Sequence, residues 1–272
     1  MPSPNHVTQE GLIVAPHGTV AFDSTQPNIA RVYDCWLGGK DHFPSDRAEA
    51  ERLLAIYPRL RECAQENRQF LERAVAWLAE QGVRQFLDVG SGLPTARNTH
   101  EVAQAADSTC RVVYVDNDSM VLTHPRAMLR DAGVTVVAGD LTDPAAILAS
   151  PGVCSHIRLD EPIGLILGLF LHFLDADTAR EITAAFTGAI APGSYVVISV
   201  GSADEDTGGQ LVEEYAAGTF HNHSPAQIVG FFSGLDLVGP GLADAGDWEP
   251  GLLARPHDHH GGRILAGVGL KP

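Results

Sequence analysis

Two amphipathic helices are predicted in the first third of the chain. Between residues 46 and 82 the apolar positions recur at helical spacing. They are Leu53, Leu54, Ile56, Phe70, Leu71, Val75 and Leu78. Pro58 interrupts the pattern, so we expect one helix on each side of it. Residues 1–27, in contrast, are rich in Pro, Thr, Ser and Asn without any period, which predicts a flexible lead segment.

From residue 84 onward, short apolar runs alternate with stretches of helical character. The runs expected to be strands are 84–89, 112–115, 134–137, 163–167 and 194–199, with 235–238 and 264–268 closing one edge. The helices expected between them are 96–106, one after Asp118, one capped by Asp177 that ends near Ile190, and short ones near 208–217 and 225–232. Continuous apolar strands separated by helices predict an α/β fold, with a mainly parallel sheet covered on both faces.

The domain organisation follows from these changes of pattern. We expect a flexible segment over 1–27, a helical N-terminal extension or lid over 28–82, and the α/β domain over 83–272. The four cysteines are far apart and form no CxxC pair, which favours reduced thiols over a disulfide framework or a zinc site. The first residues do not have the pattern of a secretory signal, and the longest apolar run, 163–174, is too short to span a bilayer. We therefore expect a cytoplasmic protein.

Charge narrows the choice of partners. The chain has 34 acidic and 18 basic residues and a net charge of -16. Such a charge repels phosphate backbones and anionic membrane surfaces, so nucleic acid and membranes are disfavoured partners. A small molecule, or else a protein, is the expected partner, and the sequence leaves the oligomeric state open.

Three of the predicted strands end in a carboxylate. Asp88 precedes Gly90 and Gly92 at the end of the first strand, and these glycines permit a tight turn and a close approach of the backbone to a ligand. Asp116 ends the second strand, at the separation from Gly92 expected of a carboxylate that binds ribose hydroxyls. Asp140 follows the third strand, where it could bind an adenine amino group. Each feature alone could be a turn or a helix cap, but together they favour a nucleoside-cofactor site.

These motifs resemble those of class I S-adenosylmethionine (SAM)-dependent methyltransferases. The segments 28–43, 67–73, 234–241 and 267–272, with Trp248, further resemble an actinobacterial family of SAM methyltransferase-like proteins whose substrate is unassigned. The resemblance covers nearly the whole chain from Asn28, although His42 stands where Asn is usual.

The resemblance implies a Rossmann-like three-layer sandwich with a seven-stranded sheet, a reversed edge hairpin and SAM as cofactor. Within the shared pattern the residues around the methionine part of SAM would be Asp88, Gly90, Ser91 and Gly92. Those around the ribose and adenine would be Asp116, Asn117, Asp140 and Leu141. The expected activity is methyl transfer to an unidentified small-molecule or protein acceptor.

The segment 33–43 combines aromatic, charged and glycine residues in what we expect to be a loop, a composition typical of functional surfaces. Tyr33, Gly38 and Lys40 are candidates to line the cofactor or acceptor pocket. The alternative is that Trp36 and Leu37 only anchor the extension to the sheet.

His172, after the fourth strand, is the candidate general base, although a position at a helix start or in the core is favoured for such a histidine, and contact with the cofactor or substrate is a further alternative. His221 and His223 could face the acceptor or lie at the surface. The histidines of 257–260 share no defined face, so we assign no metal. Arg68 and Arg73 fit a solvated helix face better than carboxylate recognition.

Two other functions remain open on the sequence. A nonenzymatic SAM-binding or regulatory module would keep the three carboxylates but lack an acceptor pocket. An NAD-dependent oxidoreductase could use Asp116 for a ribose, but Thr95 replaces the third glycine of the usual fingerprint. Asp88 would also face a pyrophosphate of like charge, which disfavours this reading.

Overall fold

The computed structural model describes residues 23–95, 97–123, 133–252 and 262–272. The expected flexible segment 1–27 therefore lies largely outside the described residues, as does the histidine cluster 257–260. None of the helices within the described ranges is long and apolar enough to cross a membrane.

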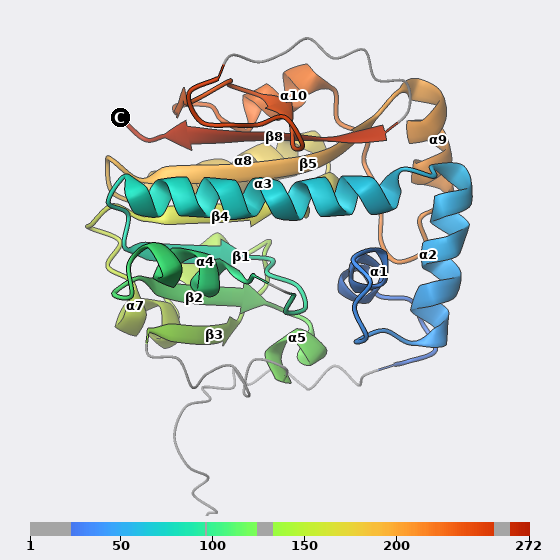
Figure 1. Ribbon diagram of the computed structural model, residues 1–272, viewed down its shortest axis with the longest axis horizontal. Coiled ribbons are helices and arrows are strands. Elements are labelled where there is room, and N and C mark those ends of the chain that lie inside the picture. Colours follow the sequence, from blue (N-terminus) through green and yellow to red (C-terminus); the bar gives the residue numbers. More distant parts are fainter. Residues whose placement is uncertain (1–22, 96, 124–132, 253–261) are drawn as a thin grey trace, which may run out of the picture.

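The centre of the molecule is a mainly parallel sheet in the order β3-β2-β1-β4-β5-β8-β6 (Figure 1). The strands are β1 (Gln85–Val89), β2 (Arg111–Asp116), β3 (Val134–Ala138), β4 (Gly164–Gly168), β5 (Tyr195–Ala203), β6 (Asp236–Leu237), β7 (Ala243–Asp244) and β8 (Gly262–Leu270). β8 is antiparallel to both β5 and β6, which confirms the reversed edge. The short β7 also pairs with β8, beyond the seven strands expected.

Helices cover both faces of the sheet, as the continuous apolar strands predict. Successive residues of β1 point to opposite faces, so Phe86 belongs to one core cluster and Leu87 to the other. The helices packed with Phe86 are α3 (Leu60–Glu80) and α4 (Thr99–Ala106). Those packed with Leu87 are α6 (Pro144–Leu148), α7 (Pro151–His156), α8 (Ala176–Ala189) and α10 (Pro225–Gly230). Both halves of the core are therefore centred on the strand that carries Asp88.

Several local expectations are corrected. The predicted helix near 96–106 begins only at Thr99, and α6 and α7 occupy a stretch for which no helix was expected. The cap of α8 is Asp175, whose carboxylate accepts the backbone N–H groups of residues 177 and 178, whereas Asp177 lies in the first turn. The sequence has two carboxylates two residues apart, and the residue at which the helix begins decides which of them is the N-cap.

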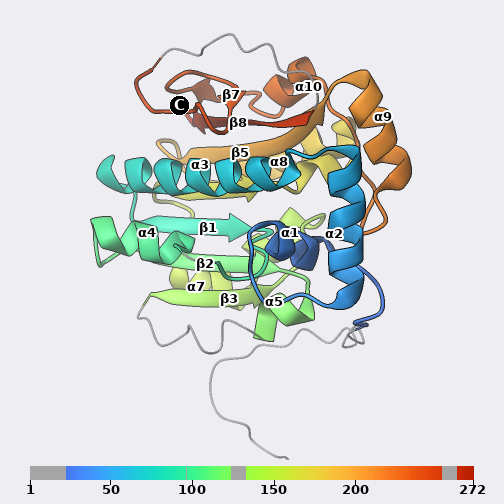
Figure 2. The same cartoon turned by 45° about the vertical axis from the view of Figure 1, so that its right-hand side comes forward.

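The N-terminal extension forms a helical cap beyond the carboxyl ends of the parallel strands (Figures 1 and 2). The cap consists of α1 (Ile29–Trp36) and α2 (Pro44–Ile56), with α9 (Glu205–Glu214) beside α2, whereas α3, also within residues 28–82, packs on the sheet. The expectation of a loop from residue 33 is wrong for its first part, which is the end of α1. Arg31 and Asp34 are buried in α1 together with Val32 and Trp36, so part of the buried side of this helix is charged.

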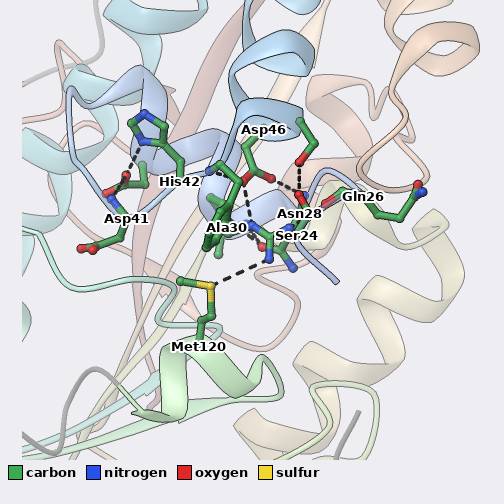
Figure 3. A network of polar contacts seen from close by, with 12 residues as sticks. Ser24, Gln26, Asn28, Ala30, Asp41, His42, Asp46 and Met120 are labelled. Carbon is green, nitrogen blue, oxygen red and sulfur yellow. Dashed lines mark hydrogen bonds and ion pairs between the residues drawn. The ribbon is translucent and has the colours of Figure 1, made fainter. Parts of the chain in front are cut away.

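A buried ion pair holds α1 against α2 (Figure 3). Arg31 Nε donates to Asp46 Oδ2 at 2.8 Å, and the exposed fractions of the two side chains are 4% and 0%. Asp46 also accepts the backbone N–H groups of Asn28 and Phe43, at 2.9 and 2.7 Å. Arg31 Nη1 reaches Met120 Sδ at 3.9 Å, in α5 (Ser119–Thr123), so the same network ties the cap to the α/β domain.

A second carboxylate shapes the turn between α1 and α2. Asp34, buried in α1, accepts the backbone N–H of Asp41 at 3.0 Å and lies 2.8 Å from His42 Nδ1. A Cβ at position 39 would lie 1.9 Å from Asp34 Oδ1, so only glycine fits at Gly39. His42 thus has a structural contact within the turn.

We expect Asp46→Ala to lower the free energy of unfolding by about 3–5 kcal/mol, because it removes the carboxylate of a buried ion pair. Urea denaturation followed by circular dichroism measures the change. Asp160→Ala, which removes an exposed partner of Arg158, is the control and should have little effect. Equal losses in the two variants would show that the buried pair does not support the cap.

Candidate functional site

A cavity of about 300 Å³ lies at the carboxyl ends of β1, β2, β3 and β4, beneath the helical cap. Its wall includes the three strand-end carboxylates Asp88, Asp116 and Asp140, and it extends to α1, α3 and Tyr215. Of the predicted cofactor residues, those on this wall are Tyr33, Asp88, Gly90, Ser91, Gly92, Asp116, Asn117, Asp140 and Leu141. The cavity thus gathers residues from both the extension and the α/β domain.

The turn after β1 has the open backbone that a close ligand approach requires. Gly90 and Gly92 have φ values of +73° and +65°, a region that favours glycine. A Cβ at Gly90 would approach Phe170 to 3.2 Å and Leu141 to 3.3 Å. A side chain at this position would therefore crowd the cavity wall as well as strain the turn.

Asp116 is fixed at the end of β2 by backbone groups. Its Oδ2 accepts the N–H of Gly92 and its Oδ1 accepts the N–H of Asp118, both at 2.9 Å. The side chain is nearly buried, and this burial raises the carboxyl pKa above its usual value. The turn after β1 and the end of β2 are thereby locked together at the cavity edge.

Asp88 is the more strongly perturbed carboxyl. Burial raises its pKa to about 6, although the hydroxyl of Thr99, which donates to Oδ2 at 2.6 Å, and the nearby Arg68 both oppose the rise. The charge of Asp116 adds to it. A buried carboxylate whose ionised form is disfavoured is well prepared to meet a cationic ligand.

The adenine end expected at β3 is more exposed. Asp140 Oδ1 accepts both the backbone N–H and the hydroxyl of Thr142, at 2.9 and 2.7 Å. Leu141 contributes an apolar side chain to the cavity beside it. The arrangement offers an apolar surface next to an exposed carboxylate, which suits a flat ring with a polar edge.

A strained residue lies on the opposite wall. Leu169 follows β4 with a φ of +54°, unusual for a residue with a branched side chain, and donates its backbone N–H to Ser199 O at 2.9 Å. Backbone strain of this kind clusters at binding sites, where surrounding contacts enforce it. Leu169 lines the cavity beside Gly168 and Phe170.

Sequence reasoning missed Asn67 of α3 and favoured the wrong alternative for Arg68. Asn67 and Arg68 both line the cavity, and neither Asn67 Oδ1 nor Arg68 Nε, although buried, has a hydrogen-bond partner among the described residues. Arg68 also lines a smaller cavity together with Asp88 and Gly92. The expectation that Arg68 belongs to a solvated helix face is wrong. The helical period identified the buried side of α3, but not that part of this side faces a cavity.

Arg73, further along α3, also does not belong to a solvated helix face. Its guanidinium donates to the carbonyl oxygens of Trp248 and Ala245, at 2.9 and 2.6 Å. It therefore ties α3 to the segment that precedes β8.

The structure separates the predicted residues of the extension. Tyr33 lies on the cavity wall, where its hydroxyl donates to Ala64 O at 3.0 Å and burial raises its pKa. Trp36 also lies there, although the sequence suggested it only as an anchor. Gly38 and Lys40 are exposed and are not among the cavity residues. The reason is that α1 continues to Trp36, which carries the next residues away from the strand ends.

His172 is a core residue of the 3-10 turn after β4, not part of the cavity wall. Its Nδ1 accepts the N–H of Gly201 at 3.3 Å, and burial lowers its pKa to about 3. His223 is likewise buried and lies 3.2 Å from Leu171 O through Nε2, while His221 is half-buried. These placements favour the structural alternative for His172. Among the described residues, no cluster of His, Cys, Asp and Glu could hold a metal ion.

Comparison with known proteins gives a consistent result. The model of the S-adenosyl methyltransferase family matches residues 17–272. A Thermobifida fusca YX protein assigned as a methyltransferase is 40% identical over 91% of this chain and 96% of its own, with a TM-score of 0.81. A DUF574 family protein from Streptomyces avermitilis MA-4680 is 35% identical over 92% of this chain and 99% of its own, with a TM-score of 0.83. None of the curated proteins searched matches the chain.

A more distant structure agrees in fold. An O-methyltransferase family protein from Burkholderia thailandensis shares 14% identity over 82% of this chain and 70% of its own, with a TM-score of 0.50. The family match over most of the chain, the two similar structures and the strand-end site together identify it: the chain belongs to the S-adenosyl methyltransferase family and is a SAM-dependent methyltransferase with the class I fold.

Proposed function

We propose that the cavity holds SAM along the carboxyl edge of the sheet and presents its methyl group to a small-molecule acceptor under the helical cap. The observation that carries this proposal is the pair of buried carboxylates, Asp88 and Asp116, on one cavity wall with the open turn between Gly90 and Gly92. In an open α/β sheet, ligands bind beyond the strand ends where the strand order reverses, here between β1 and β4.

The strand order supports a position for each part of the cofactor. Asp116 and Asn117 would bind the ribose and adenine at β2, and Asp140 with Leu141 the adenine at β3. The methionine part would lie over the turn after β1, where Asp88 provides negative charge and Arg68 Nε offers an unpartnered donor to the carboxylate. SAM bound in this way supplies an activated methyl group.

The chain itself would contribute position more than proton transfer. His172 lies in the core, and the described residues that line the cavity near α1 and Tyr215 include no histidine that could act on the acceptor. Methyl transfer depends mainly on near-attack geometry, which α1 and the strained Leu169 would enforce. The size of the cavity and its position under the cap favour a small acceptor over a protein. We place the enzyme in the cytoplasm, in keeping with its four free cysteines.

Calorimetric titration with SAM, S-adenosylhomocysteine and NAD tests the assignment. We expect saturable binding of the first two without binding of NAD, and NAD binding alone would refute the proposal. Asp116→Ala should weaken SAM binding at least about 10-fold, because the ribose loses a charged hydrogen-bond acceptor. Asp143→Ala is the matched control, since this carboxylate caps α6 outside the cavity wall. Unchanged affinity in folded Asp116→Ala would refute the ribose assignment.

Arg68→Met tests the methionine end. If Arg68 binds the carboxylate, the variant should bind SAM and S-adenosylhomocysteine about 10- to 100-fold more weakly. Its affinity for 5′-methylthioadenosine, which lacks the amino-acid part, should be unchanged. Arg61→Met, on an exposed position of the same helix, provides the control. Equal weakening of all three ligands would show that Arg68 only supports the shape of the site.

Asp88→Asn should stabilise the ligand-free protein above pH 6. The raised pKa means that the folded protein holds the Asp88 proton more tightly than the unfolded chain does. This contribution to stability is fully present below about pH 4 and is lost as the pH rises through about 6. At pH 8 the loss amounts to about 3 kcal/mol, which the asparagine avoids while it can still accept the Thr99 hydrogen bond.

Thermal unfolding of wild type and Asp88→Asn between pH 4 and pH 8 measures this difference. The two melting temperatures should converge near pH 4 and diverge above pH 6. Asp236→Asn, which alters an exposed carboxyl, should follow the wild type at every pH. The same Asp88→Asn protein should bind SAM more weakly at pH 8. A variant with unchanged stability and unchanged affinity for SAM would contradict the role of Asp88.

A further inference from the structure

The end of the cavity near α1 is apolar and aromatic. The residues that give it this character are Ile29, Trp36, Phe173, Leu174 and Tyr215. Trp36 Nε1 donates to Ala50 O at 3.4 Å, so its only polar atom already has a partner. The rings of Phe173 and Tyr215 pack with centroids 5.6 Å apart. A wall of this kind binds a flat apolar molecule and offers little to a charged one.

Asn67, which lines the cavity beside Tyr33 of α1, adds a polar group to this end. Asn67 Nδ2 donates to Tyr33 Oη at 3.0 Å, and Tyr33 Oη donates its own proton to Ala64 O at 3.0 Å. Because that one proton is used on Ala64, the amide must present its NH2 group to the tyrosine. The orientation of the Asn67 amide is therefore fixed by its contacts, and its carbonyl oxygen points elsewhere.

This carbonyl oxygen is prepared for a hydrogen-bond donor. Asn67 is 2% exposed, and its Oδ1 has no hydrogen-bond partner among the described residues. Both the residue and its tyrosine partner line the main cavity. A buried acceptor without a donor is costly, so a ligand N–H or O–H at this place would gain affinity by satisfying it.

The contacts of Asn67 assign it to the acceptor and not to the cofactor. Its partner Tyr33, together with Trp36 and Leu169, also borders a second, apolar cavity of about 70 Å³ on the side of α1. The next residue, Arg68, borders the small cavity of Asp88 and Gly92 in addition to the main cavity. The division between the two ends of the site thus falls between neighbouring residues of α3.

We propose that the methyl acceptor is an uncharged, planar aromatic molecule with an N–H or O–H group, and that Asn67 Oδ1 accepts the hydrogen bond from this group. The inference depends on the proposed function, because it takes the adenosine and methionine parts of SAM to occupy the carboxylate end. The aromatic side chains select the ring, and Asn67 selects the donor and its direction. Asn67 is in this sense a specificity-determining residue.

A matched pair of probes tests the proposal on the full chain saturated with S-adenosylhomocysteine. 2-Naphthol carries a donor, and 2-methoxynaphthalene has the same ring system without one. We expect 2-naphthol to bind about 10-fold more tightly, as measured by ligand-observed NMR titration. Asn67→Leu should lower the affinity for 2-naphthol to that for the ether and leave the affinity for S-adenosylhomocysteine within about twofold of wild type.

Tyr33→Phe is the control for loss of the hydrogen bond between the two residues. It breaks the same contact but keeps Asn67 Oδ1, so it should still prefer 2-naphthol. If Asn67→Leu does not fold, Asn67→Ser, which withdraws the oxygen from the cavity, should show the same loss of preference.

The outcomes separate this proposal from the proposed function. A wild type that does not bind S-adenosylhomocysteine refutes the function itself. Cofactor binding with equal affinities for the two naphthalenes, or with neither of them bound, overturns only the acceptor proposal. Asn67→Leu that loses S-adenosylhomocysteine affinity instead would place Asn67 at the methionine end and also overturn it.

Discussion

The buried pair of Arg31 and Asp46 is the contact on which the rest of the site depends. Burying two charges costs free energy, and hydrogen bonds between the ion pair and backbone groups offset part of this cost. Asp46 accepts two backbone N–H groups besides Arg31, and Arg31 also donates to Gln26 O at 2.6 Å. These bonds fix the start of α1, its angle to α2 and its contact with α5. They thereby help to hold Tyr33 and Trp36 over the strand ends, together with the hydrogen bonds that these two residues make themselves.

The carboxyl edge of the sheet brings together groups that are destabilising in the ligand-free protein. Asp88 and Asp116 are both buried, and burial raises both pKa values. The charge of Asp116 adds to the rise at Asp88, and the charge of Asp118 adds to the rise at Asp116. Leu169 adds backbone strain on the facing wall. Such costs are typical of binding sites, where a ligand of complementary charge recovers what the free protein loses. A sulfonium and an ammonium group would be complementary to this wall.

The site also changes character along its length. Exposed and buried carboxylates dominate at β1, β2 and β3, whereas aromatic rings dominate under α1 and near Tyr215. The first part belongs to the ends of the parallel strands. The second part combines residues of α1 with residues that follow β4 and α9, so it depends on contacts between segments far apart in the sequence.

The sequence by itself determined the order of the main strands, the mainly parallel sheet and the carboxylates at three strand ends, although not the helices α6 and α7. The strand features are local: continuous apolar runs, glycines at the turn after β1, and acidic residues at or just after the ends of β1, β2 and β3. The cavity confirms that Asp88, Asp116 and Asp140 lie together, because parallel strands bring their carboxyl ends to one edge.

The tertiary structure alone decided what depends on contacts between distant residues. It placed His172 in the core, and it turned Gly38 and Lys40 to the outside because α1 runs to Trp36. It also brought Asn67 and Arg68 into the cavity, although their spacing along α3 indicated only a helix face. A periodic pattern shows which side of a helix is buried. Whether that side meets packed side chains or a cavity is set by the elements opposite, which here lie dozens of residues away in the chain.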